Sequence, residues 1–123
     1  KMAKILIIED EEFLRGMINR KLTAGGFEVI ESIDGDDGLE KAKNEKPDLI
    51  LLDLILPGIN GFDVLAKIKE EPLTASIRVI ILSNLGQREE IKKGLALGAV
   101  DYLVKAYFTP DQIMEKIQKV LNK

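Results

Sequence analysis

Four apolar runs of the chain each end in polar side chains of a kind that can handle a charged group. These side chains are Glu9 and Asp10 after the first run, Asp53 after the third, Ser83 after the fourth and Lys105 after the fifth. Carboxylates held close together repel one another, and a hard divalent cation such as Mg²⁺ relieves that repulsion. An aspartate can accept a phosphoryl group by covalent catalysis, while an ammonium and a hydroxyl neutralise and hydrogen-bond the phosphoryl oxygens. The set therefore predicts phosphoryl acceptance at Asp53, with Mg²⁺ bound beside it.

Each of these residues also has an ordinary structural interpretation. Asp10 alone could cap the helix that follows it, and Asp53 could be a turn residue. Ser83 could be a loop hydroxyl, and Lys105 a solvated charge. The joint pattern favours the chemical interpretation, because four strand ends supplying complementary groups are hard to obtain by chance.

The apolar runs have the composition and spacing of strands in a parallel sheet. They cover residues 5–8, 27–30, 49–52, 79–82 and 102–104. Four of the five are apolar throughout, which is typical of strands covered on both faces. Between and after them, apolar residues at helical spacing predict helices that contain Phe13 to Leu22, Leu39 and Ala42, Val64 to Ile68, Ile91 to Ala99, and Ile113 to Leu121. The chain therefore predicts an α/β fold with five helices on both faces of a five-stranded parallel sheet.

Local signals place the helix ends. Thr109, Pro110 and Gln112 form a cap, a proline at the first helical position and a capping-box partner. Further predicted caps are Asp34, Asn60 and Asn84, and the predicted stops are Gly25-Gly26, Pro47 and Pro72.

The strand order 2-1-3-4-5 is taken from the flavodoxin-like group of doubly wound folds. In that order the first and third strands are neighbours, which brings Glu9, Asp10 and Asp53 together at the edge where ligands bind. The second strand, ending in Glu31-Ser32-Ile33, lies at an outer edge, and we expect it to add little to the site.

Composition narrows the classes of function. The chain has 123 residues, 46% of them hydrophobic, and a formal net charge of −3, which fits one domain over 1–123 and gives no basic patch for direct nucleic-acid binding. It has no cysteine and no histidine, so thiol chemistry, disulfides, a histidine base and the usual zinc sites are excluded. No apolar run is long enough for membrane insertion and no signal peptide is present, so we expect a cytoplasmic location.

Several segments together resemble the receiver domain of bacterial two-component response regulators, over essentially the whole chain. The matching segments are Ile7-Ile8-Glu9-Asp10-Glu11, then Asp53-Leu54-Ile55-Leu56-Pro57-Gly58-Ile59-Asn60-Gly61, then Ile81-Leu82-Ser83, and finally Gly98-Ala99-Val100-Asp101-Tyr102-Leu103-Val104-Lys105. An aspartate followed by proline four residues on and glycine eight residues on is specific to this family.

The resemblance implies a role for each matching residue. Asp53 would be the phospho-acceptor, Asp10 would bind Mg²⁺ directly, and Glu9 would bind it mostly through water. The backbone carbonyl of Ile55 would be a further ligand. Lys105 would pair with the phosphoryl group, Ser83 would hydrogen-bond it, and Ser83 and Tyr102 would be the residues of the conformational switch.

The resemblance also implies partners. The phosphodonor would be a histidine kinase or a histidine phosphotransfer protein in a phosphorelay, and the protein would be a switch rather than an enzyme. The fourth helix, fifth strand and fifth helix would form the face that binds a downstream partner or a second copy in a homodimer. Tyr107 and Phe108 would either add aromatic surface to that face, or one of them would simply pack against the last helix. The domain either works as a stand-alone regulator or belongs to a longer protein.

Three positions depart from the family pattern. The proline usual after the lysine is replaced by Ala106, which leaves open whether the Lys105–Ala106 peptide bond is cis or trans. The small residue usual after the serine is Asn84, which would narrow the site. Ile55 offers no amide or acid to orient an attacking water, so we expect slow autodephosphorylation.

Other classes of protein remain as alternatives. A receiver-like interaction module that is never phosphorylated would normally lack one of the acids, the acceptor or the lysine, and all are present. A haloacid-type phosphatase would need a second aspartate at the position of Ile55. A flavin-binding domain would need a phosphate-cradling loop in place of Glu9-Asp10-Glu11-Glu12.

Overall fold

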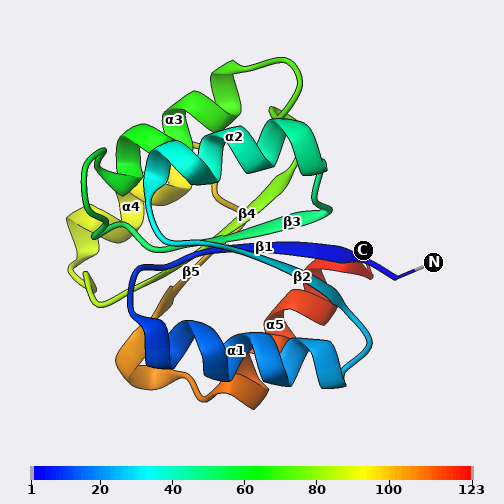
Figure 1. Cartoon of the computed structure of the whole chain (residues 1–123). Helices are drawn as coiled ribbons and strands as arrows, with labels where there is room; N and C mark the ends of the chain where they lie inside the picture. Colours follow the sequence, from blue (N-terminus) through cyan, green and yellow to red (C-terminus); the bar gives the residue numbers. More distant parts are fainter. Residues whose placement is uncertain (1, 123) are drawn as a thin grey trace.

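Runs of Ile, Leu and Val form the strands at the centre of the molecule. The computed structural model describes residues 2–122, and its strands are β1 (Lys4–Ile8), β2 (Glu28–Ser32), β3 (Leu49–Leu52), β4 (Arg78–Ser83) and β5 (Asp101–Val104). They pair in parallel in the order β2-β1-β3-β4-β5 (Figure 1). The predicted fold class and strand order are therefore confirmed.

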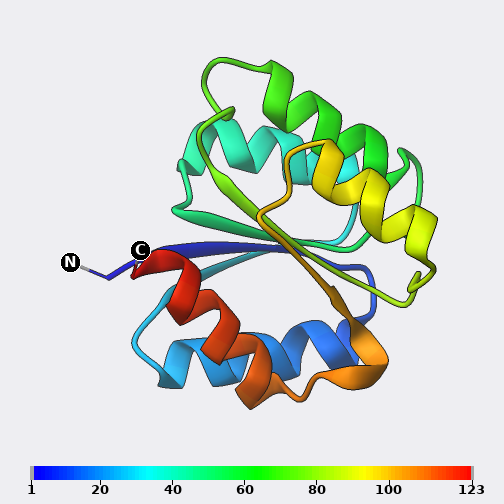
Figure 2. The same ribbon diagram turned by 180° about the vertical axis from the view of Figure 1, so that it is seen from behind.

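The helices lie in two layers, one on each face of the sheet. They are α1 (Glu12–Ala24), α2 (Gly35–Glu45), α3 (Gly61–Glu70), α4 (Arg88–Ala96) and α5 (Pro110–Leu121), with a short 3-10 helix η1 (Lys105–Tyr107) before the last. Helices α2, α3 and α4 cover one face, and α1 and α5 cover the other (Figures 1 and 2).

Alternation along the strands divides the core in two. In β1, Leu6 and Ile8 pack towards α2, α3 and α4, whereas Ile5 and Ile7 pack towards α1 and α5. All four side chains are buried. A strand that buries both faces has no solvent side for polar residues, so polar groups can only follow the strand.

Side-chain caps fix where most helices begin. Asp34 accepts a hydrogen bond from the Asp37 N–H at 2.8 Å, and Asn60 accepts one from Phe62 at 2.7 Å. At the last helix, Thr109 accepts a hydrogen bond from the Gln112 N–H, and Gln112 accepts one from the Thr109 N–H, as the predicted capping box requires.

Two local expectations differ from the structure. The fourth helix was expected to begin at a cap on Asn84, which is wrong: its cap position is Gln87, because Ser83 still belongs to β4 and the chain needs the intervening residues to turn. The second strand was expected at 27–30, and it lies at Glu28–Ser32, because its register with β1 extends to the pair Ile8 and Ser32.

The loop after β3 is packed against its own strand. A β-carbon on Gly61 would lie 2.3 Å from the Leu54 Cα and 2.6 Å from the Asp53 carbonyl oxygen. Only glycine allows this close approach of two backbone segments. The loop that carries Asp53 is therefore closed tightly by the start of α3.

None of the helices within residues 2–122 is long and apolar enough to span a membrane. The predicted domain over 1–123 includes Lys1 and Lys123, which lie outside the described residues.

Candidate functional site

The predicted site residues meet at the carboxyl edge of the sheet. Glu9 and Asp10 follow β1, Asp53 follows β3, and Lys105 follows β5. Carboxylate oxygens of Glu9, Asp10 and Asp53 all lie within 4.8 Å of one another. Two of these three acids are buried, with Glu9 2% and Asp53 4% exposed, whereas Asp10 is exposed. The strand order thus brings acids from distant parts of the sequence into one cluster.

Lys105 joins two of the three acids. Its Nζ lies 2.8 Å from Glu9 Oε1 and 2.9 Å from Asp53 Oδ2, and its side chain is 11% exposed. Burial lowers the pKa of Lys105, but the hydrogen bonds and charges of Asp53 and Glu9 outweigh burial, so the pKa is raised above its usual value. The ammonium therefore stays charged between the two carboxylates.

Glu9 has the opposite balance. Burial raises the pKa of its carboxyl, and the charge of Asp53 adds to this effect, while Lys105 and the backbone N–H of Glu11 only partly counteract it. The Glu11 N–H donates to Glu9 Oε2 at 3.0 Å. A buried carboxylate with a raised pKa is one that would gain from a further positive charge nearby.

The donor set fits a hard divalent cation. Three carboxylates against one ammonium leave two negative charges uncompensated within the cluster. All three acids offer oxygen, the ligand type that Mg²⁺ prefers, and the exposed Asp10 leaves the cluster open to water on one side. Hydrogen bonds orient both oxygens of the Asp53 carboxylate. The Ile55 N–H donates to Oδ1 at 3.2 Å, and Lys105 Nζ donates to Oδ2 at 2.9 Å.

Ser83 is fully buried at the end of β4. Its Oγ accepts a hydrogen bond from the Leu85 N–H at 3.3 Å, and this contact does not use the hydroxyl hydrogen. The next residue, Asn84, is exposed. Ser83 therefore lies at the same edge as the acids with a proton to donate.

The loop after Lys105 resolves two open questions. Within residues 2–122 no peptide bond is cis, so the Lys105–Ala106 bond is trans, and Lys105 still contacts both acids. Phe108 packs against the core beneath α5, while Tyr107 is 76% exposed. Phe108 is thus a packing residue, and Tyr107 belongs to the surface.

Tyr102 points into the molecule. It is 9% exposed, and its hydroxyl donates to the Leu85 carbonyl in the loop after β4. Burial, together with the charges of Glu90 and Asp53, raises the pKa of Tyr102 to about 12. The predicted switch residue therefore contacts the loop that follows Ser83.

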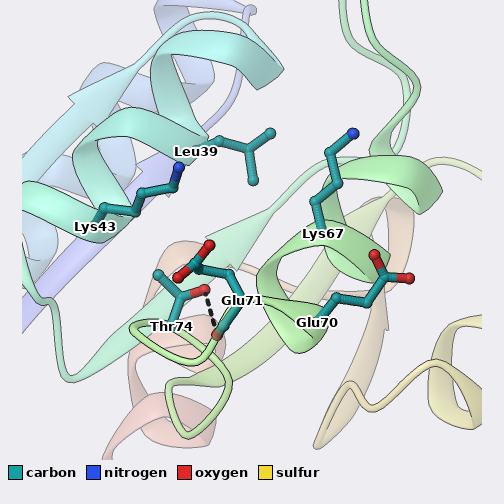
Figure 3. Close-up of a pocket in the computed structure, with 6 residues that line it drawn as sticks. All are labelled: Leu39, Lys43, Lys67, Glu70, Glu71 and Thr74. Carbon is teal, nitrogen blue, oxygen red and sulfur yellow. Dashed lines mark hydrogen bonds between the residues drawn. The ribbon is translucent and has the colours of Figure 1, made fainter.

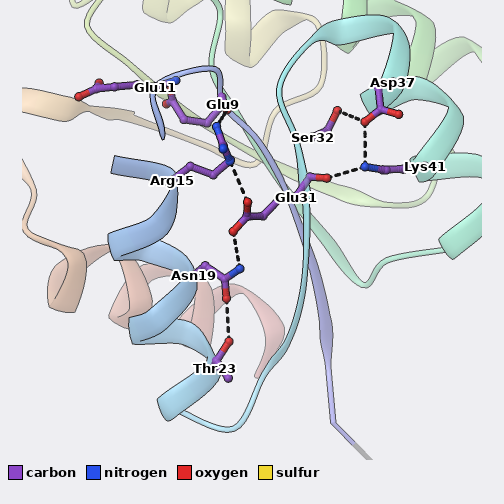
Figure 4. A network of polar contacts seen from close by, with 9 residues as sticks. All are labelled: Glu9, Glu11, Arg15, Asn19, Thr23, Glu31, Ser32, Asp37 and Lys41. Carbon is purple, nitrogen blue, oxygen red and sulfur yellow. Dashed lines mark hydrogen bonds and ion pairs between the residues drawn. The ribbon is translucent and has the colours of Figure 1, made fainter. Parts of the chain in front are cut away.

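One side chain that contacts the backbone of the acid cluster was not predicted from the sequence. The side chain of Arg15, in α1, reaches both the backbone of Glu9 and the carboxylate of Glu31 at the end of β2 (Figure 4). Arg15 and Glu31 are 16 residues apart, and no periodicity or motif in a single sequence pairs them.

A separate hollow of about 280 Å³ lies between α2 and α3, away from these residues (Figure 3). It is lined by Leu39, Lys43, Lys67, Glu70, Glu71 and Thr74. None of the predicted site residues lines it, so it is not the place where the acids act.

A doubly wound parallel sheet whose carboxyl edge gathers an acid cluster, a lysine and a buried serine defines the receiver class of signalling domains. The chain belongs to this family: the model of the response regulator receiver domain matches residues 5–118. It is a CheY-like receiver domain of two-component systems.

Known proteins agree with this assignment. The chain is 38% identical to the chemotaxis protein CheY of Bacillus subtilis over 97% of its own length and 98% of that protein. It is 35% identical to the phosphate regulon transcriptional regulatory protein PhoB of Rhizobium meliloti, and it spans 53% of that protein's length. A CheY-like receiver domain protein from Methanospirillum hungatei superposes with a TM-score of 0.92 at 28% identity, covering 99% of this chain and 95% of that one.

Proposed function

We propose that the domain accepts a phosphoryl group on Asp53 in a Mg²⁺-dependent reaction and that phosphorylation changes which proteins it binds. The observation that carries the proposal is the contact of the buried Asp53 with Lys105 at 2.9 Å, inside a cluster of three carboxylates. A buried aspartate paired with an ammonium, inside an acid cluster that keeps a net negative charge for Mg²⁺, supports phosphoryl acceptance.

The chemistry needs one bond to form and one to break. An oxygen of the Asp53 carboxylate attacks phosphorus, and the bond from phosphorus to the donor's leaving group breaks with its electron pair. The leaving group is acetate when the donor is acetyl phosphate. When the donor is a phosphohistidine, the leaving group is an imidazole nitrogen, which takes up a proton.

The remaining residues orient and neutralise. Glu9, Asp10 and Asp53, with the Ile55 carbonyl, would hold Mg²⁺, which supplies positive charge for the phosphoryl oxygens. Lys105 would keep its ammonium against one of those oxygens, and its raised pKa supports a charged form at neutral pH. Ser83 would donate its hydroxyl proton to another.

Ser83 also supports a route from the site to the surface. Leu85 contacts both switch residues, because its N–H donates to Ser83 Oγ and its carbonyl accepts from the Tyr102 hydroxyl. A movement of the Ser83 side chain towards the phosphoryl group would therefore shift the loop at Leu85. We infer that the surface formed by α4, β5 and α5 changes with this loop and binds a downstream partner or a second copy. A histidine kinase or phosphotransfer protein is the proposed donor.

The proposed switch is not an enzyme acting on other molecules, and its reset depends on water. Ile55 is 55% exposed beside Asp53, and its side chain has no group that could orient a water for attack. We therefore propose slow autodephosphorylation. The cytoplasmic location expected from the sequence stays a prediction.

An intact-mass measurement tests the proposal. The protein is incubated with Mg²⁺ and acetyl phosphate, and we expect a gain of one phosphoryl group that is absent in Asp53→Asn and in samples with EDTA. Asp36→Asn, which removes an exposed acid on α2, is the matched control and should label like the wild type. If no phosphoryl group is gained at any Mg²⁺ concentration, the domain is instead an interaction module that is not phosphorylated.

A further inference from the structure

We propose that Arg15 is a positioning residue for the metal site, with Glu31 as its charge partner; this inference rests on the proposed function of the acid cluster. The Arg15 side chain is 13% exposed and makes two directed contacts. Its Nη1 donates to the Glu9 carbonyl oxygen at 3.0 Å, and its Nε donates to Glu31 Oε1 at 2.8 Å (Figure 4).

The accepting carbonyl is the one that matters for the acids. The Glu9 carbonyl belongs to the peptide unit that joins Glu9 to Asp10, and a peptide unit is planar. Holding that oxygen therefore fixes the plane from which both acidic side chains leave the backbone. Asp10 is exposed, so its direction depends on this plane more than on packing around its own side chain.

The backbone N–H of Glu9 is held from the same side. It donates to the Ser32 carbonyl at the end of β2, at 2.9 Å, so the pairing of β1 with β2 continues one residue past the strand. Glu9 is thus gripped at its N–H by β2 and at its carbonyl by Arg15. Strand β2 contributes no side chain to the acid cluster, yet its last two residues hold the backbone of that cluster.

Glu31 allows an arginine to lie next to a cation-binding site. A guanidinium near three carboxylates would compete with a divalent cation for them. The Glu31 carboxylate pairs with Arg15, and its second oxygen accepts a hydrogen bond from Asn19 on the next turn of α1. The Glu31 backbone carbonyl is held as well, by Lys41 at 2.7 Å. The guanidinium is therefore kept on the backbone carbonyl and away from the acidic side chains.

Three possible roles of Arg15 predict different changes in Mg²⁺ affinity when its side chain is removed. If its charge were all that mattered, removing it would tighten Mg²⁺ binding, because a repelling cation would be lost. If it positions the acids, removing it weakens Mg²⁺ binding, because the peptide plane is released. A purely structural link between α1 and β2 would change thermal stability and leave the Mg²⁺ dissociation constant alone.

Calorimetric titration of the whole protein with Mg²⁺, without any phosphodonor, separates these roles. We expect the dissociation constant to rise about tenfold in Arg15→Gln, the scale typical of groups that orient metal ligands. Arg15→Lys keeps the charge but has one donor head for two acceptors, so it should fall between the two proteins. Glu31→Gln should also weaken Mg²⁺ binding, because the guanidinium is no longer held away from the acids. High salt should reduce this loss of affinity, because it screens the repulsion between the guanidinium and Mg²⁺.

The matched control is Lys21→Gln, which removes one positive charge and one ion pair from the same helix, at an exposed pair with Asp111. Its dissociation constant should stay within twofold of the wild type. At saturating Mg²⁺, labelling of Arg15→Gln by acetyl phosphate should approach the wild-type rate, whereas the Mg²⁺ concentration for half-maximal rate should rise with the dissociation constant.

Each result decides the matter. Unchanged or tighter Mg²⁺ binding in folded Arg15→Gln overturns this inference while leaving the proposed function intact. Failure of the wild type to bind Mg²⁺ overturns both. If circular dichroism shows that Arg15→Gln does not fold, Arg15→Lys and Glu31→Gln carry the test, and wild-type affinity in both of them overturns the inference.

Discussion

The acid cluster and helix α4 are anchored in opposite ways. Glu9 and Asp53 are buried, both contact the ammonium of the partly buried Lys105, and the three residues follow three different strands. In α4 the only buried residue is Gly94, whereas α3 buries Gly61, Val64, Leu65 and Ile68. A β-carbon on Gly94 would lie 2.5 Å from Ile81 Cδ1 and 3.0 Å from Tyr102 Cδ2, so α4 approaches the sheet through a residue with no side chain of its own.

This difference indicates where the molecule can change at little cost. A glycine in a helix interior is about 1 kcal/mol less favourable than alanine, and it contributes no side chain to the core. Charged groups that are buried and mutually paired are costly to separate. We therefore expect phosphorylation to occur at the rigid acid cluster, and the conformational change to occur in α4 and the loop before it.

The largest effect on stability should come from removing the ammonium that joins the two buried acids. Lys105→Met leaves Glu9 and Asp53 buried without their shared cation, and we expect it to lower the free energy of unfolding by about 3 kcal/mol at neutral pH in EDTA. Urea unfolding measures the loss. Mg²⁺ should restore part of it, because the cation relieves the same repulsion. A variant as stable as the wild type in EDTA would show that the site is not firmly anchored.

The exposed residue beside Asp53, Ile55, should affect the rate of dephosphorylation rather than the stability of the fold. Ile55→Asn places an amide beside Asp53, and we expect the phosphorylated form to lose its phosphoryl group about tenfold faster, below the effect of a fully positioned acid or base. The decay is followed by intact mass after the donor is removed. Ile33→Asn, at another exposed isoleucine, is the control and should not change the lifetime. Decay of the wild type within seconds would contradict the proposal of a slow reset.

A smaller effect should follow from loosening the α4 side. Tyr102→Phe removes the hydroxyl that donates to the Leu85 carbonyl, and we expect a loss of about 1 kcal/mol in unfolding free energy, typical of one hydrogen bond. Phosphorylation at saturating Mg²⁺ should continue, since Tyr102 touches none of the acids. Loss of labelling in this variant would show that the two regions are not separable.

The smallest effect on stability should come from the exposed ion pair of Asp37 and Lys41, which belongs to neither region. Hydrogen bonds from Lys41 and then Ser32 lower the pKa of Asp37 below its ordinary value of 3.8. Its contribution to stability is therefore present above pH 3.8 and is lost as the pH falls through the lowered pKa of the folded state. Asp37→Asn should cost about 0.5 kcal/mol at pH 7, because the pair is well solvated. Urea unfolding from pH 7 down to pH 2 should show the two proteins converging in acid; a constant difference would contradict this assignment.

Much of the fold was predictable, because short apolar runs and helical spacing alternate without interruption. The convergence of Glu9, Asp53 and Lys105 followed from two general properties: parallel strands end at the same edge, and the order of flavodoxin-like folds makes the first and third strands neighbours. The start of α4 was not predictable, because Asn84 and Gln87 are both polar residues before the same helix, and tertiary contacts decide between them. The support from Arg15 was not predictable either, since an arginine on an amphipathic helix usually faces water.

Lys105 and Asp53 are 52 residues apart in the chain, and Glu9 lies further away still. Contacts of such long range form only after much of the chain has been ordered, because closing long loops costs entropy before the contact is gained. During synthesis, no nascent chain can assemble the acceptor until its fifth strand has emerged and added to the sheet. If the proposed function holds, only a domain whose fifth strand is in place would accept a phosphoryl group, and a product truncated before that strand would not compete for the donor.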